Sequence, residues 1–220
     1  MKSDVQIHHD VMAELAWDTR VDATDLGIEV ERGVVTLTGS VSSYAKKRAA
    51  QDAAHRVAGV LDVANDLTVG LPSTMTQTDA ELAPAVRRAL SWDALVPDEK
   101  IRCTVSDGLV TLEGSVDVWQ QREEAETAVW RLAGIRGVTN NLLVIAPKAE
   151  AREIRDLVEH ALVRRAEREA HRITVEADGG VVTLSGRVGS WHEKQAIVGT
   201  AGHAPGTHMV IDKLLLDTTD

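Results

Sequence analysis

Three segments of the chain repeat the same alternation of apolar and polar residues. In the first segment, Val35, Leu37 and Val41 fall on one side of an extended chain, with threonine and serine between them. This alternation predicts a strand with one buried face. The segments are GVVTLTGSV (33–41), GLVTLEGSV (108–116) and GVVTLSGRV (180–188), and their starts lie 75 and 72 residues apart.

The copies stay in register well beyond this strand. An aromatic residue follows the central glycine, a second glycine comes later, and the pattern Val-x-Asn-x-Leu closes each copy, with Asp212 replacing the asparagine in the third. Agreement over this length indicates a threefold internal repeat. The shared positions are Gly39, Gly114 and Gly186, then Tyr44, Trp119 and Trp191, then Gly59, Gly134 and Gly206, and finally Asn65 and Asn140.

Each copy predicts a helix, two strands, a second helix and a last strand. In the first helix, Ile7, Val11 and Leu15 recur at helical spacing after a capping box that begins at Ser3. In the second copy, Pro84 lies inside this helix, and we expect it to kink the helix or delay its start.

Glycines mark the turns of each copy. Gly33 predicts a tight turn between the first two strands, and Gly59 predicts the stop of the second helix. Gly39 falls on the inward row of its strand, which predicts a bulge or a helix packed close to the backbone. We expect the second helix to bury a small-residue face, made of Ala50, Ala53, Ala54 and Val57.

Two helices on one face of a three-stranded mixed sheet make each copy a small α+β unit, so the fold class is α+β with three tandem αββαβ units. The predicted domains are residues 1–72, 73–147 and 148–220, with linkers after Pro72 and Pro147. Because the linkers are short, we expect a compact or curved array with limited freedom.

Composition narrows the class of protein. The 220 residues carry a net charge of −10, which disfavours a phosphate-tracking nucleic-acid binder. One cysteine excludes an internal disulfide and a cysteine-based zinc site. The amino terminus lacks the apolar run of a signal peptide, and no apolar stretch is long enough to span a membrane, so we expect a cytoplasmic protein that is either free or peripheral to the membrane.

The motif Ile-x-Val-x4-Gly-Val-Val-Thr-Leu-x-Gly-x-Val, the alanine-rich helix and the closing Val-x-Asn-x-Leu resemble the BON domain of bacterial osmotically inducible and nodulation proteins. The resemblance covers all three copies. It implies a non-enzymatic module of the stress-response kind, associated in relatives with phospholipid surfaces and, in one cytoplasmic relative, with potassium. It supplies no catalytic residues and no cofactor.

Trp130 is the first candidate contact residue. On the second helix it points away from the face set by Ala125, Val129 and Leu132, and the equivalent positions hold His55 and Gly202. It is therefore either an exposed anchor for a partner or a residue packed between units.

Trp17 and Trp92 end the first helices of two copies. They are either aromatic contacts at a membrane interface or, as we expect, residues packed at the edge of the core. The aromatic residues that begin the second helices are interpreted as staples against the sheet.

The third copy carries Arg164 where the other two carry these tryptophans, and further arginines follow it. Arg164, Arg165 and Arg168 form a cationic face that either meets anionic lipid or is simply solvated.

No motif for catalysis or metal binding is present. The eight histidines lack metal-ligand spacing, no nucleophile–base or phosphate-loop motif occurs, and Cys103 is expected to be a buried strand residue. Asn65 and Asn140 are interpreted as tying backbone groups by hydrogen bonds. The sequence therefore predicts a non-enzymatic, stress-associated module that presents helix faces and aromatics to a protein partner or another copy. The alternatives are binding to anionic phospholipid and potassium sensing.

Overall fold

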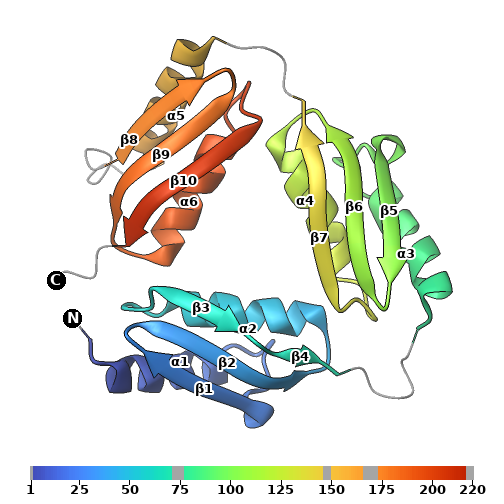
Figure 1. The fold of residues 1–220 in the computed structure, drawn as a ribbon, viewed down its shortest axis with the longest axis vertical. Coiled ribbons are helices and arrows are strands. Elements are labelled where there is room, and N and C mark those ends of the chain that lie inside the picture. Colours follow the sequence, from blue (N-terminus) through green and yellow to red (C-terminus); the bar gives the residue numbers. More distant parts are fainter. Residues whose placement is uncertain (1, 71–76, 146–149, 166–172, 217–220) are drawn as a thin grey trace.

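The computed structural model describes residues 2–70, 77–145, 150–165 and 173–216 (Figure 1). They form three units of the same architecture, called unit 1 (residues 2–70), unit 2 (77–145) and unit 3 (150–216). The predicted fold class is confirmed: in each unit, two helices pack against a mixed sheet. The predicted boundaries near residues 72 and 147 fall outside the described residues and stay a prediction.

The elements follow the order expected from the repeat. Unit 1 contains α1 (Asp4–Trp17), β1 (Leu26–Glu31), β2 (Val34–Val41), α2 (Tyr44–Arg56), β3 (Asp62–Asn65) and β4 (Thr68–Val69). Unit 2 contains α3 (Asp79–Trp92), β5 (Ile101–Ser106), β6 (Leu109–Val116), α4 (Trp119–Trp130) and β7 (Gly137–Val144). Unit 3 contains α5 (Ala151–Arg165), β8 (Ile173–Asp178), β9 (Val181–Val188), α6 (Trp191–Gly202) and β10 (Met209–Leu216).

The sheets share one topology. The first two strands of each unit form an antiparallel hairpin, and the last strand pairs in parallel with the second strand after the helical crossover. In unit 1 the predicted last strand is interrupted at residues 66–67, although the Asp66 N–H still donates to the Leu37 carbonyl. The second strand is therefore central in every sheet, and the last strand lies at an edge.

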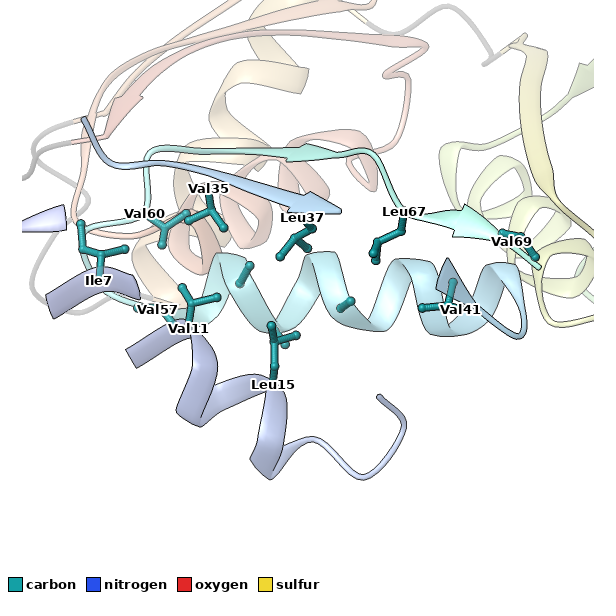
Figure 2. Close-up of a cluster of buried hydrophobic side chains, with 13 residues drawn as sticks. Ile7, Val11, Leu15, Val35, Leu37, Val41, Val57, Val60, Leu67 and Val69 are labelled. Atoms are coloured by element: carbon teal, nitrogen blue, oxygen red, sulfur yellow. The ribbon is translucent and has the colours of Figure 1, made fainter. Parts of the chain in front are cut away.

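Each unit has its own apolar core between the helices and the sheet. In unit 1, Ile7, Val11 and Leu15 from α1 meet Val35 and Leu37 from β2, as Figure 2 shows. These are the side chains that the periodicity predicted, and the predicted alanines of α2, Ala50, Ala53 and Ala54, are also buried. Fully burying one such valine or leucine side chain contributes roughly 1.5–3 kcal/mol. Equivalent residues fill the cores of units 2 and 3.

A carboxylate ties the first helix to the hairpin turn in two of the units. Arg32 and Gly33 both have positive φ, as in a two-residue hairpin turn, and their N–H groups donate to the carboxylate of Asp4. Asp79 binds the equivalent turn of unit 2 in the same way. Unit 3 has Ala151 at this position, so its turn lacks that tie.

Two sequence expectations about backbone geometry need correction. Pro84 does not delay its helix, because α3 begins at Asp79 with Thr78 as its N-cap. Gly39 has a φ of 115°, and a Cβ there would collide with the carbonyl oxygen of Asp25, which directly precedes β1. The backbone that approaches this glycine closely is therefore the end of a short 3-10 helix, Ala23–Asp25, which leads into β1, and not one of the two helices that pack on the sheet.

Candidate interaction surfaces

The second helices α2, α4 and α6 bring the three units together. Figure 1 shows the units around a common centre, with these helices toward the middle. Three seams join them, one for each pair of units. The seams are built from residues at equivalent positions of the repeat, which the following contacts establish.

The seam between units 1 and 2 is centred on Arg48. Its guanidinium binds Glu126 of α4 with 2.8 Å between Nη1 and Oε1, and it lies 5.5 Å from the ring centroid of Trp130. Tyr44, at the start of α2, packs against the apolar cores of both units. The start of one second helix therefore rests on the end of the next.

The seam between units 2 and 3 repeats this geometry with other residues. Trp119, at the start of α4, lies against Gly202 at the end of α6, where a side chain would have no room. Glu123, which corresponds to Arg48, contacts His203 with 3.1 Å between Oε2 and Nε2. A glycine in one helix thus makes space for an indole from the neighbouring unit.

The seam between units 3 and 1 closes the ring. The indole of Trp191, at the start of α6, stacks on the imidazole of His55 in α2, with centroids 4.1 Å apart and planes 9° from parallel. Beside this stack lies a cleft of about 990 Å³, lined by both units. Its apolar lining comes from Ile7, Val57, Val60, Leu61, Trp191 and Leu216.

The three seams together define a cyclic, pseudo-threefold arrangement. In each one, the start of a second helix meets the position that holds His55, Trp130 or Gly202 in the next unit. This selects the second interpretation of Trp130, a residue packed between units. The interpretation of Trp191 as a staple against its own sheet is wrong, because its stack crosses to unit 1. In the sequence, the signal for contacts between units was the change in side-chain size at the position that holds His55, Trp130 or Gly202.

Trp17 and Trp92 are the large aromatic side chains that the ring leaves in solvent. They are 84% and 87% exposed, so the expectation that they pack at the edge of their cores is wrong. They occupy equivalent helix ends, where α1 and α3 stop. Exposed apolar side chains lie on the same segments, namely Val5 and Met12 in α1 and Leu95 after α3.

The cationic candidates of unit 3 fall at the limit of the described chain. Arg164 and Arg165 are the last residues of α5, at the helix end equivalent to Trp17 and Trp92, and their side chains lie outside the described part. Arg168 lies outside the described residues altogether. Their surface role stays a prediction.

The paired asparagines fasten the last strand to the second helix. Asn140 Nδ2 donates to the Arg122 carbonyl and to Glu126, while its Oδ1 accepts from the Leu142 N–H. Asn65 makes the same set of contacts with Lys47, Gln51 and Leu67. These bonds agree with a backbone-tying role, although the partner is a helix and not only a loop.

In unit 3, an ion pair attaches the last strand to the second helix. Asp212 binds the ammonium of Lys194 at 3.1 Å and accepts from the Leu214 N–H. In units 1 and 2, Gln51 and Glu126 accept a hydrogen bond from the asparagine amide. A carboxylate has no hydrogen to donate, so Asp212 needs no such acceptor, and the equivalent residue of unit 3 is Val198.

Four charged side chains of unit 1 form a cluster at the end of α1, next to Trp17 in the sequence. Asp18 is buried and binds Arg20 through both carboxylate oxygens, and Arg56 links it to Glu14. The hydrogen bond from the Arg20 side chain, followed by that from Arg56, holds the pKa of Asp18 far below its usual range, although burial acts in the opposite direction. The cluster fixes the end of α1, and with it the exposed tryptophan.

The described ranges can also be compared with the requirements of a metal site, a reactive cysteine and a membrane-spanning helix. Within them, His, Cys, Asp and Glu side chains form no group of three or more suited to a metal ion. Cys103 is half-buried rather than buried, and its sulfur lies 3.7 Å from a guanidinium nitrogen of Arg87. Over the same ranges, no helix has the length and apolar character that crossing a bilayer requires.

Comparison with known proteins agrees with the repeat. The family model for the BON domain matches three times, at residues 3–70, 78–146 and 151–217. Osmotically-inducible protein Y of Escherichia coli is 29% identical over 143 residues, which cover 63% of this chain and 71% of that protein. An uncharacterized protein from the gshII 5′ region of Anaplasma centrale is 27% identical over 144 residues, covering 63% of this chain and 94% of that protein.

Solved structures resemble the chain only weakly. A structure of CdsD, a structural protein of the type III secretion system of Chlamydia trachomatis, is 13% identical with a TM-score of 0.24, covering 96% of this chain and 92% of that one. The periplasmic domain of PrgH is 10% identical with a TM-score of 0.20, covering 89% and 96%. Scores this low carry no inference about this chain.

Proposed function

We propose that this chain, which belongs to the BON-domain family through all three of its units, is a non-enzymatic binding module that acts under osmotic stress. The relative named for osmotic induction supports the link to stress. The binding role rests on the surface of the ring and on the absence of any recognisable catalytic motif in the sequence. A protein partner is the proposed target.

The observation that carries this proposal is the exposure of Trp17 and Trp92. Each indole presents roughly 150–250 Å² of largely apolar surface, and leaving it in water forgoes about 4 kcal/mol of burial. The fold does not need a tryptophan here, since unit 3 has Arg164 at the equivalent position. Two exposed indoles at matched helix ends are therefore suited to insert into apolar pockets of a partner.

The ring fixes the spacing between the two anchors. Trp17 belongs to unit 1 and Trp92 to unit 2, and Arg48 joins these units through its ion pair with Glu126 and its contact with Trp130. A rigid pair of anchors loses little conformational freedom on binding. The second anchor thus adds affinity without a matching entropic cost.

A flat anionic lipid surface is the second candidate target. Trp17, Trp92 and Arg164 hold equivalent positions of the repeat, at the ends of α1, α3 and α5. Tryptophan suits the headgroup layer, and Arg164 and Arg165 supply cations at the third point. The net charge of −10 favours the protein partner. Potassium sensing stays a prediction without a supporting contact in the described residues.

The experiment is site-specific photocrosslinking with the full chain. Benzoylphenylalanine is placed at Trp17, at Trp92, or at Glu29 on the exposed sheet face as a matched control, in osmotically stressed cells of the producing organism. A discrete protein adduct from positions 17 and 92, absent from position 29, supports the proposal. Equal labelling from all three positions contradicts it.

Vesicle flotation separates the two targets. Binding to phosphatidylglycerol vesicles that is lost in both Trp17→Ala/Trp92→Ala and Arg164→Glu/Arg165→Glu favours the lipid surface. If the unmodified chain does not float with the vesicles and photocrosslinking captures a protein, the protein partner is favoured.

A further inference from the structure

The contact that closes the ring contains a titratable side chain. His55 is only 7% exposed and stacks in parallel on Trp191, which belongs to the unit farthest from it in the sequence. Within the described part of the chain, its Nδ1 atom is buried without a hydrogen-bond partner. A neutral imidazole with Nδ1 unprotonated suits this environment, whereas an imidazolium would bury an Nδ1–H donor without an acceptor.

The charged groups around His55 come from both sides of the seam. On unit 1, Asp52 of α2 and Asp62 of β3 attract a positive charge, and the neighbouring Arg56 is bound to carboxylates of α1. On unit 3, the Lys194 ammonium lies 5.5 Å from the centroid of the Trp191 ring, and His192 and Glu193 follow Trp191 in the sequence of α6. A proton on His55 would therefore bring a second cation to an indole that already faces one.

Burial outweighs the two aspartates. Desolvation lowers the pKa of His55, and the attraction of Asp52 and Asp62 offsets only part of that effect. When unit 3 moves away, the imidazole regains water and its ordinary affinity for protons. Proton uptake is therefore linked to separation of the two units.

We propose that the His55–Trp191 stack is a pH-sensitive latch, and that mild acidification opens the ring between units 1 and 3. The ring then becomes an open row that remains joined through unit 2. Opening also exposes the apolar lining of the adjacent cleft, including Ile7, Val57 and Leu216.

The other two seams do not open under the same conditions. Between units 2 and 3, protonation of His203 turns its 3.1 Å contact with Glu123 into an ion pair. Between units 1 and 2, the Arg48–Glu126 ion pair and the contact with Trp130 involve no imidazole. A proton on histidine thus weakens the seam at His55 and adds an ion pair at His203, and the Arg48–Glu126 contact offers it no imidazole.

The test measures the distance between units 1 and 3 in the full chain. A fluorescent donor and acceptor are attached to Glu29→Cys and Glu176→Cys, both on exposed outer strands, in a Cys103→Ser background. Lowering the pH from 8 to 5 should lengthen this distance. Below pH about 6.5, the ratio of open to closed ring should rise up to tenfold per pH unit, until it levels off at the pKa of the closed form.

Two variants decide whether His55 is responsible. His55→Phe keeps a stacking ring without a titratable group, so its distance should stay short down to pH 5. His55→Lys should be open at pH 8. If His55→Phe fails to fold, as judged by circular dichroism at pH 8, His55→Trp replaces it, because Trp130 occupies the equivalent position in unit 2.

A pair of labels across units 2 and 3, at Glu113→Cys and Glu176→Cys, serves as the control and should hold its distance. An unchanged distance between units 1 and 3 down to pH 5 would overturn the latch. So would an identical acid response in the non-titrating variant. Neither result touches the proposed partner contacts, which photocrosslinking tests separately.

Discussion

Trp119 of α4 lies over the backbone of Gly202 in α6, so closely that a Cβ on residue 202 would stand 2.8 Å from Trp119 Cδ1. Real Cβ atoms do not approach other heavy atoms to this distance, so any side chain at this position must displace the indole. The absent methyl group therefore permits the contact between units 2 and 3. The same helix contains Gly199, whose Cβ would meet nothing within 4 Å.

These two glycines give a matched pair of substitutions. Gly199→Ala should raise the free energy of unfolding by about 0.5–1 kcal/mol, because alanine is the better helix former. Gly202→Ala gains the same propensity but overpacks the seam, so it should lower stability by about 1–2 kcal/mol. Urea unfolding followed by circular dichroism measures both. Equal stabilisation by the two variants would contradict this account, because it would show that the Trp119 indole can move aside without loss of stability.

Thr207 is a polar residue in an apolar position. Units 1 and 2 have Val60 and Ile135 there, and the Thr207 hydroxyl is buried without a partner among the described residues. Thr207→Val should therefore raise the free energy of unfolding by about 1–2 kcal/mol. Thr200→Val is the control, because the Thr200 hydroxyl donates to the Ala196 carbonyl, and its loss should leave stability unchanged or lower. Thermal unfolding at pH 7 distinguishes the two.

The asparagine network predicts different costs for the same substitution in two units. Asn140→Asp places a carboxylate where Nδ2 stood, 3.2 Å from the Glu126 carboxylate, and should destabilise the protein by about 2 kcal/mol at pH 7. In Asn65→Asp the facing group is the neutral amide of Gln51, which carries no charge to repel the new carboxylate. That variant should lose less than about 1 kcal/mol. Urea unfolding at pH 7 compares them, and equal losses would contradict this account.

Asp18 makes stability depend on pH in the acid range. Because its pKa is depressed in the folded protein, the unfolded chain takes up this proton first as the pH falls. Its contribution is complete above pH about 4 and is lost progressively below that value. Asp18→Asn should cost about 2 kcal/mol at pH 7, and the difference from the unmodified protein should shrink between pH 4 and 2.

The control for this prediction is Asp93→Asn in unit 2. Asp93 occupies the equivalent position but accepts from the Leu95 N–H, a bond that asparagine can also accept. Its cost at pH 7 should be smaller. A constant difference between Asp18→Asn and the unmodified protein from pH 7 to pH 2 would rule out the ion-pair explanation.

The repeat pattern was sufficient to predict the fold of each unit. Apolar spacing identified Ile7, Val11 and Leu15, and alternation identified Val35 and Leu37, because burial by the unit's own elements is a local and periodic property. Comparison of the copies also identified the position of Trp130 as one that the fold leaves free to vary.

The arrangement of the units lay beyond those patterns. The partner of His55 is Trp191, and the partner of Trp119 is Gly202, residues whose nearness depends on how three domains dock. Such contacts have no sequence period. The exposure of Trp17 was also missed, since we expected it to pack at the edge of the core, although Arg164 at the equivalent position already argued against deep burial.

The cyclic order of the second helices also limits how large the structure can grow. A linear stack of repeats leaves a bare face at either end, to which further copies can add. Here the first and third repeats meet each other, and each junction uses a different pair of side chains, so a fourth copy finds no vacant, matching site. The second helices of the three described units therefore leave no free end at which a further repeat could join this ring.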